Sequence, residues 1–536
     1  MTSDPAAHER EPTPGPDSDR TIASPFTLGC GAVLGNRVIK AAMTECLASA
    51  RTNAPNARIA SLYARWAAMS RAGALITGNI QVDRRWLEAP RNVVVEDERD
   101  IEALRDWADG VQRGGRTRLI AQLSHAGRQC PVSVTGLAAP PAPSALRGVS
   151  QALPVFNRSR AMSEPEILDV VARFAAAARV LARAGFAGVE VHAAHGYLIS
   201  QFLSPRTNLR RDAWGGSLEG RSRLLLEVVR AVRAAVPRGF IVAVKLNSAD
   251  FQRGGFSEDD AVGVVAALEA ERVDLLEISG GNYESSKMME PVGPSAARSA
   301  AREAFFVDFA ARLRRATRIP IMLTGGIRSL ACMSQLLSSG TIDFVGLGRP
   351  FAVAPRLVAE MLHVRPAACA YALPNAARAP GRVRICITVC GRMHSRSARA
   401  RRHAFQCGVL CARECGACVK AFRYAYGLCS SACTRAAQRA VEGAGDGMVF
   451  PSTAFSLGFK VFEAAEENLC HQACMRAIAD GREPDLRWSR GRTAAALLTG
   501  VLPIYVWSPG KSGPVGWFIV GSLLAAASAA LARALL

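Results

Sequence analysis

The sequence predicts an α/β fold, a (β/α)₈ TIM barrel with a C-terminal helical, hydrophobic extension. Eight short apolar runs alternate with helical patterns between Ser24 and Leu362, which is long enough for a barrel core of ~250 residues and its insertions. Several of these runs are apolar at nearly every position, as strands buried on both faces are. Polar signatures follow the ends of the runs, where barrel enzymes carry their functional residues. A doubly wound sheet is the rival fold, but it needs neither eight strands nor these signatures.

The expected elements follow one another in the order that a barrel requires. Between the strands, apolar residues recur at helical spacing in Glu164–Ala184, Arg221–Ala235 and Ser257–Glu269. The segment Cys130–Arg160 is too rich in Pro and Ser for a regular element, and we expect an excursion after the third strand. The eight predicted strands are Arg37–Ala42, Ala74–Thr77, Arg118–Leu123, Gly188–His192, Ile241–Leu246, Asp274–Ser279, Pro320–Thr324 and Asp343–Leu347.

The most informative polar cluster follows the fourth strand, where His192, His195 and Tyr197 lie close in sequence. Two imidazole N–H groups can polarise one carbonyl oxygen and stabilise the enolate that forms when the compound is reduced. A neutral Tyr can then protonate the neighbouring carbon. The alternatives are hydrogen-bonded structural side chains or a zinc site, but no third zinc ligand stands at a recognisable spacing. We therefore predict no metal site here.

A second signature follows the last two strands, with Gly325 and Gly326 after the seventh and Gly348 and Arg349 after the eighth. Glycines let the backbone approach a phosphate, amides at a helix start donate to it, and an Arg binds it through two hydrogen bonds. A phosphate site after strands seven and eight recurs in this fold. The paired signature predicts that a phosphate-bearing cofactor binds here.

Seven motifs together resemble the Old Yellow Enzyme family of FMN-dependent NAD(P)H:flavin oxidoreductases, over roughly residues 24–362. The longest is HAAHGYLISQFLSPRTNLRRDAWGGSLEGRSRLLLEVV. The others, in family order, are NRVIKAAMTE, LIAQLSHAGRQ, VAVKLNSADFQRGGFS, LLEISGGNYE, LTGGIRS and VGLGRPFAVAP. Residues 452–500 resemble, more weakly, the C-terminal tail of one bacterial and fungal branch.

The resemblance implies a barrel that holds one FMN and assigns its contacts by position. Lys245 stands where many members have Arg near flavin N1 and O2, so the positive charge is kept but the planar guanidinium group of Arg is lost. Ala42 replaces a commoner Pro, and Trp214 a commoner Tyr, without touching the proposed chemistry. The cofactor-binding positions so implied are Ala42, Met43 and Thr44 against the ring, Asn79 and Gln122, Lys245, and the phosphate residues Gly325, Gly326, Gly348 and Arg349.

The same resemblance implies the reaction. NAD(P)H reduces the flavin, and an electron-poor alkene, an α,β-unsaturated carbonyl compound, takes the hydride while His192 and His195 hold its oxygen and Tyr197 acts as proton donor. Two alternatives remain open within the sequence. One is a flavin NADH oxidase or demethylase-type member that uses the same site on another substrate. The other is a catalytically silent, membrane-associated scaffold.

Residues 366–450 break the pattern, because they are rich in Arg, Ala and Cys without a clean period. From Arg365 to Asp446 we count 14 Lys and Arg against 3 acidic residues, a net +11 of the total +21. Nine of the 15 cysteines also lie here, between Cys369 and Cys433. The interpretations are a disordered insert or a gene-model artefact, a metal site, or a basic binding patch. The first is favoured, because the bias interrupts a continuous match, and we expect no nucleic-acid partner.

Both termini differ in character from the barrel. Residues 1–23 are polar and Pro-rich, which predicts a disordered arm and no secretory signal, and hence a cytoplasmic protein. After the predicted barrel (24–365) and the insert, residues 451–492 read as an amphipathic helical segment. Residues 493–536 are hydrophobic. They are either a membrane anchor or a pair of helices that pack on the barrel.

Overall fold

The computed structural model describes residues 21–147, 156–279, 307–325, 327, 330–363 and 475–482. Within them, eight parallel strands close into a barrel, because β3 pairs with both β4 and β13. The fold class predicted from the sequence is confirmed. The barrel strands are β3 (Val38–Lys40), β4 (Ala74–Gln81), β6 (Arg118–Ser124), β9 (Gly188–Ala193), β10 (Ile241–Asn247), β11 (Leu275–Ser279), β12 (Ile321–Thr324) and β13 (Phe344–Leu347).

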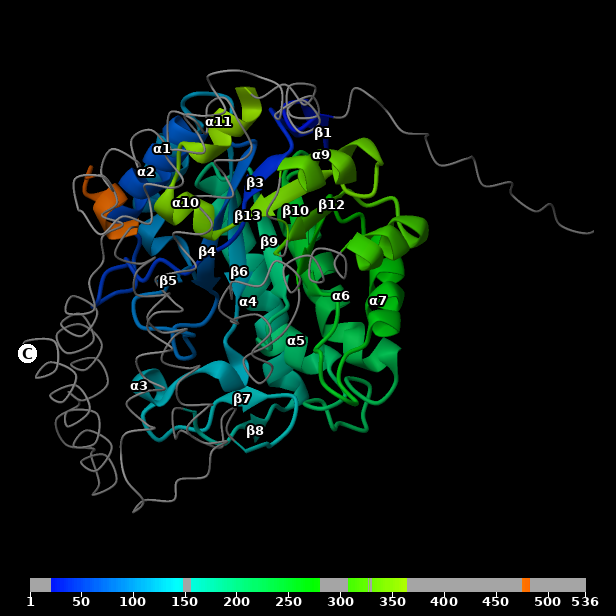
Figure 1. The fold of residues 1–536 in the computed structure, drawn as a ribbon. Coiled ribbons are helices and arrows are strands. Elements are labelled where there is room, and N and C mark those ends of the chain that lie inside the picture. Colours follow the sequence, from blue (N-terminus) through cyan, green and yellow to red (C-terminus); the bar gives the residue numbers. More distant parts are fainter. Residues whose placement is uncertain are drawn as a thin grey trace, which may run out of the picture.

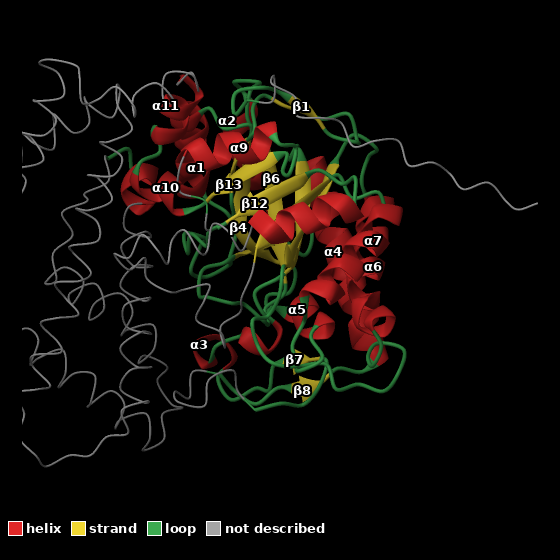
Figure 2. Ribbon diagram, turned by 45° about the vertical axis from the view of Figure 1, so that its right-hand side comes forward, coloured by secondary structure: helices red, strands yellow, loops and turns green. Residues whose placement is uncertain are grey.

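Each of the eight predicted strands overlaps one of these. The chain also forms a short strand that the sequence did not suggest, β5 (Val93–Val94), which pairs with the end of β4. The predicted helices are present with slightly different limits, as α4 (Glu164–Arg183), α6 (Leu218–Ala235) and α7 (Glu258–Ala270). Figures 1 and 2 show the helices around the outside of the strands.

Side-chain caps fix where several helices begin. Ser163 and Glu166 form a capping box at α4, and Ser257 and Asp260 form another at α7. Asn56 accepts backbone N–H groups at the start of α1. Other helices are α1 (Ala57–Ser70), α2 (Ile101–Gln112), α5 (Leu198–Leu203), α9 (Leu330–Ser338), α10 (Arg349–Val353), α11 (Leu357–His363) and helical residues 307–316.

The apolar core has two parts. The larger lies between strands and helices, and it includes Trp66, Trp107 and Phe174. The smaller draws on seven of the eight barrel strands together with Leu28 and Leu34, from the hairpin of β1 (Phe26–Thr27) and β2 (Val33–Leu34). This second cluster fills the barrel at the amino ends of its strands. The barrel is therefore packed shut at that end.

The excursion after the third barrel strand extends from the opposite end, where α3 (Val132–Thr135), β7 (Pro141–Ala142) and β8 (Arg160–Ala161) lie below the barrel in Figures 1 and 2. The expectation of no regular element here was too strict, although these pieces are only two to four residues long. Pro and Ser limit the length of such elements without excluding a single turn or bridge.

Several predictions lie outside the described residues. They are the N-terminal arm to residue 20, the insert at 366–450, most of the segment at 451–492 and the tail at 493–536. No helix in the described part of the chain is long and apolar enough to cross a membrane. Nor do the described ranges contain a group of three His, Cys, Asp or Glu residues that could hold a metal ion.

Residues 475–482, orange in Figure 1, pack against α1 although more than a hundred residues separate them from the barrel in sequence. Met475 and Ile478 are buried, and Ser61 donates to the carbonyl of Ala479 at 2.9 Å. Arg58 forms two hydrogen bonds of 3.0 Å with Asp480. At residues 475–482 the chain thus lies against the surface of the barrel.

Ile478→Ala is expected to weaken this docking by about 2–5 kcal/mol, because it leaves a cavity under the segment. Asp480→Ala should cost much less, since the ion pair is exposed and screened by solvent. Hydrogen exchange of the amides of residues 475–482 measures both effects. Equal loss of protection in the two variants would contradict this expectation, because the ion pair would then contribute as much as burial.

Candidate active site

The inward-facing positions change from apolar to polar along several strands of the barrel. Side chains two residues apart point to the same face of a strand. On the inside of β6, Gln122 therefore follows Ile120. In the same way Lys245 follows Ala243 on β10, and Glu277 follows Leu275 on β11. The apolar residues Ile120, Ala243 and Leu275 belong to the apolar core. The polar half lies at the carboxyl ends, where barrel enzymes place their active sites.

A buried group of charges occupies this polar half. The Lys245 ammonium lies 2.8 Å from a Glu277 carboxylate oxygen, and the Gln122 amide donates to Glu190 at 2.5 Å. Burial and the charge of Glu277 raise the pKa of Glu190 well above its usual value. Burial by itself would raise the pKa of Glu277 too, but Lys245 and hydrogen bonds lower it overall. Glu277 is therefore the ionised member of the carboxyl pair, and its charge balances Lys245.

The three residues predicted to bind and protonate the substrate come together at the end of β9. The His192 ring lies 5.1 Å from that of His195 and 4.8 Å from that of Tyr197, measured between ring centres. His192 is the last inward residue of the strand, while His195 adopts a positive φ of 60° in the turn that follows. Tyr197 caps α5 and is buried. One turn thus directs all three side chains to one place.

Both imidazoles are neutral, and their neighbours set which nitrogen carries the proton. Burial lowers the pKa of His192 well below its usual value, and His195 and Lys245 add to the effect. Burial and Lys245 do the same for the pKa of His195. The Ala194 N–H donates to Nδ1 of His192 at 3.3 Å, which leaves Nε2–H as a donor. His195 Nε2 lies 2.8 Å from the Ser279 hydroxyl. When that hydroxyl donates to Nε2, the ring proton of His195 is on Nδ1, and Nδ1–H is the donor that remains for a substrate.

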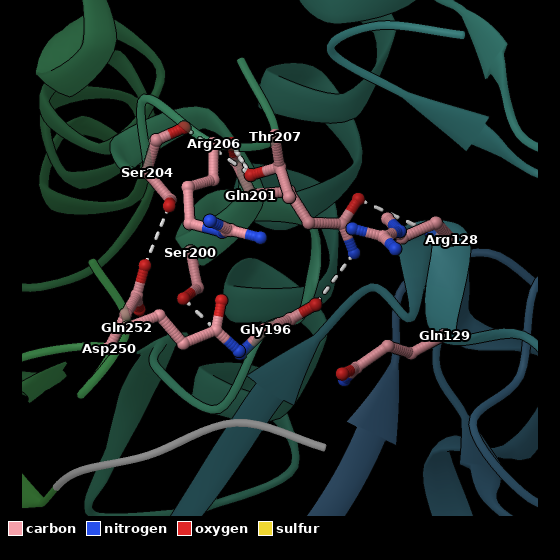
Figure 3. Close-up of a pocket in the computed structure, with 10 residues that line it drawn as sticks. All are labelled: Arg128, Gln129, Gly196, Ser200, Gln201, Ser204, Arg206, Thr207, Asp250 and Gln252. Carbon is pink, nitrogen blue, oxygen red and sulfur yellow. Dashed lines mark hydrogen bonds between the residues drawn. The ribbon is translucent and has the colours of Figure 1, made fainter. Parts of the chain in front are cut away.

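Hydrogen bonds from a side-chain amide fix the turn that carries these residues, as Figure 3 shows. Gln201 donates to the carbonyl of Gly196 at 2.7 Å and accepts the Arg128 N–H at 3.2 Å. A Cβ at Gly127, whose φ is +55°, would meet the Gln201 amide at 2.6 Å. The hydrogen bonds of Gln201 therefore connect the loop after β6 to the loop after β9.

The pocket drawn in Figure 3 is polar, and Arg128, Ser204 and Asp250 are among the residues that line it. Its cavity volume of about 20 Å³ suits water rather than an organic substrate. This pocket therefore has room for water beside the turn that carries His195 and Tyr197.

The predicted phosphate residues lie at the ends of β12 and β13. Gly325 has a φ of +93°, and Gly348 precedes α10, whose first residue is Arg349. A Cβ at Gly348 would touch the Met43 side chain at 3.6 Å, so this turn adjoins the segment after β3. Gly326 lies outside the described residues.

The segment after β3 carries Ala42, Met43 and Thr44, all partly exposed at the barrel mouth. Thr44 and Asn79 both donate to the carboxylate of Glu88, and the hydroxyl of Tyr197 donates to it as well. Burial raises the pKa of Glu88, although these hydrogen bonds lower it in part. Glu88 is a central member of the site that the sequence patterns missed.

Other members were missed as well. Asn247 accepts the backbone N–H of His195 at 3.1 Å, and Ser279 contacts the ring of the same residue. A signal was present for Glu190 and Glu277, because each is a charged residue inside an otherwise apolar strand. Only paired or functional charges are retained at such positions. Glu88 carries no such signal, since it lies in a loop.

The donor set fits an FMN. Lys245 provides a cation inside the barrel, and Arg349 with the neighbouring glycines provides the chemistry that a phosphate requires. The buried Asn79 Oδ1 has no hydrogen-bond partner within the described residues, so it is free to accept from a bound group. The residues that would hold the cofactor therefore surround the same barrel mouth as the two His and the Tyr.

Comparison with known proteins agrees with this fit. Residues 21–367 match the family model described as the NADH:flavin oxidoreductase / NADH oxidase family. The chain is 38% identical over 355 residues to the NADH-dependent flavin oxidoreductase iliE of Hypocrea jecorina, covering 62% of this chain and 86% of the relative. It is 30% identical to an NADH oxidase of Thermoanaerobacter brockii, covering 59% of this chain and 47% of that protein.

Solved structures with the same barrel include two flavoenzyme relatives. One is the old yellow enzyme homologue from Zymomonas mobilis, with a TM-score of 0.54 and 26% identity over 63% of this chain and 92% of that one. The other is morphinone reductase in complex with tetrahydroNAD, with a TM-score of 0.53 and 26% identity over 64% and 90%. The chain belongs to the NADH:flavin oxidoreductase / NADH oxidase family, the Old Yellow Enzyme family, and is an FMN oxidoreductase with NAD(P)H as its reductant.

Proposed function

We propose that this protein reduces the C=C bond of α,β-unsaturated carbonyl compounds. The observation that carries the proposal is the convergence of two neutral imidazoles and a phenol at the end of β9. Such a set suits a substrate that gains negative charge on one oxygen and a proton on a nearby carbon. Membership of an enzyme family counts against the silent scaffold considered above.

When bound, FMN would supply the redox chemistry, which is the transfer of a hydride from NAD(P)H to the β-carbon of the alkene. The imidazole N–H groups of His192 and His195 hold the carbonyl oxygen and stabilise the charge that develops there. Because both rings are neutral, they act as hydrogen-bond donors without transferring a proton. Tyr197 gives its proton to the α-carbon.

The buried charges support the same step. Lys245 would place a positive charge beside the bound cofactor, and Glu277 offsets part of that charge, because it pairs with the ammonium group. Gln201 and Asn247 hold the turn in place, so that the two donors and the acid keep a fixed separation. The buried core around the strands makes this arrangement rigid.

The proposal predicts both the product and the origin of its hydrogens. With deuterated NADH and cyclohex-2-enone under nitrogen, we expect the saturated ketone with deuterium on the β-carbon only. The α-hydrogen should come from solvent, through Tyr197. NADH consumption that requires oxygen and leaves the enone unchanged would instead favour the oxidase alternative.

His192→Ala is expected to weaken the binding of a phenolic ligand by about 10- to 100-fold, because a hydrogen bond to a charged oxygen is lost. The fraction of FMN bound should stay the same. Spectral titration of the flavin with the phenol measures the affinity. Unchanged affinity would contradict the role of His192 as an oxygen-binding donor.

A further inference from the structure

Glu88 has no role in the reaction described so far, yet it lies among its parts. It belongs to the loop that leaves β4, and it accepts hydrogen bonds from Thr44, Asn79 and Tyr197. Thr44 follows β3, Asn79 lies in the last part of β4, and Tyr197 follows β9. One carboxylate thus connects two predicted flavin-binding positions with the predicted proton donor.

The loop that carries Glu88 is held by hydrogen bonds of its own. Asn92 accepts the backbone N–H of Ala89 at 2.9 Å, and the Arg91 guanidinium donates to the carbonyl of Ala48 at 2.9 Å. These contacts lie directly after Glu88 in the chain. The carboxylate is therefore presented by an ordered loop rather than by a free side chain.

The surroundings of Glu88 allow it to hold a proton. Its hydrogen-bond donors are neutral side chains that lower its pKa only in part, and burial raises that pKa overall. The titratable groups around it are Tyr197, the His192 ring beside Tyr197, and Cys46 with Glu45 on the segment after β3.

Two of these neighbours are neutral across the neutral pH range. Burial, with the charges of Glu88 and Glu45, raises the pKa of Cys46 to about 12, and burial lowers the pKa of His192. Glu45 accepts hydrogen bonds from the Tyr63 hydroxyl and the backbone N–H of Gly78. Tyr197 is the neighbour that is hydrogen-bonded to Glu88 and also releases a proton in the proposed reaction.

We propose that Glu88 is a positioning residue that resupplies Tyr197 with its proton, a role that rests on the enone reduction proposed above. Tyr197 gives its O–H proton to the α-carbon, where the enolate electron pair forms the new C–H bond, and a phenolate remains. Protonated Glu88 gives its proton to that phenolate oxygen and recovers one from solvent. Each turnover consumes one solvent proton, and the relay itself requires no oxidant or reductant.

Glu88→Gln tests the relay, because the amide keeps the shape of the side chain but cannot supply a proton. The protonated carboxyl is the active form, so in the wild type the steady-state rate of cyclohex-2-enone reduction should fall as the pH rises through the pKa of Glu88. The variant should be about tenfold slower at mildly acidic pH, and its rate should not show this pH dependence. Anaerobic steady-state turnover with NADH measures both, because the relay acts between one turnover and the next.

Glu96→Gln is the matched control. Glu96 forms an ion pair with Arg84 and does not contact Tyr197 among the interactions described. This variant should keep the pH dependence of the wild type. If Glu88→Gln also keeps it, the relay is overturned. If the wild type is not reoxidised by enones at all, the proposed function fails and the relay fails with it.

An infrared titration tests the pair without turnover, with Glu88→Gln identifying which C=O band belongs to Glu88 and not to the buried Glu190. The C=O band of a protonated carboxylic acid should disappear as Glu88 ionises. In Tyr197→Phe its midpoint should move to higher pH, because the phenol that stabilises the carboxylate is gone. An unshifted midpoint would show that Glu88 and Tyr197 do not exchange a proton, and would overturn the relay.

Discussion

Tyr197→Phe is expected to slow reoxidation by an enone by about 10²–10⁴-fold, the range over which general acids contribute. Phe keeps the ring packed against His192 but has no proton to give to the α-carbon. Reduction by NAD(P)H should change little, since that step delivers a hydride and needs no acid. Separate stopped-flow measurements of the two half-reactions give both rates.

His192→Ala is the companion variant, since it should weaken ligand binding while leaving the acid, Tyr197, in place.

Losses of equal size in both half-reactions of Tyr197→Phe would contradict the role of Tyr197 as proton donor. Such a result would indicate instead that the phenol positions the flavin, through its hydrogen bond to Glu88 and the contact of Glu88 with Thr44.

Lys245→Met is expected to lower the free energy of unfolding by about 3–5 kcal/mol, because it leaves the fully buried Glu277 without its partner. The same change removes the cation that the fit assigns to the flavin, so FMN should also bind more weakly. Urea unfolding at a fixed FMN concentration measures the stability.

The double variant Lys245→Met with Glu277→Gln separates the two effects. Removing both charges should restore much of the stability, since no charge is then left unpaired. It should not restore FMN affinity. Full recovery of FMN binding in the double variant would contradict the assignment of Lys245 to the cofactor.

The barrel could be predicted from the sequence because its strands are buried on both faces. Ile241–Leu246 and Asp274–Ser279 read as strands from their apolar residues alone, and β10 and β11 occupy nearly the same limits. The strand β5 was not predicted from turn residues in the sequence, and it is only two residues long. Its existence depends on the end of β4 being available for pairing, which local sequence does not encode.

The candidate site was predictable where its residues end a strand. His192 and Lys245 face each other in register on neighbouring strands, as their positions in the motifs require. Glu88 could not be found in this way, because the path of a loop, and not strand periodicity, brings it to Tyr197. Ser279 ends a predicted strand. Its contact with His195 joins the end of β11 to the turn after β9, across β10, and it therefore depends on the arrangement of the strands in the barrel.

The most direct test of the central claim is the visible absorption spectrum of the purified protein under nitrogen. The account predicts a flavin spectrum that NAD(P)H bleaches and that an enone restores. A colourless protein that cannot be reconstituted with FMN, or a bleached flavin that no enone reoxidises, would contradict it.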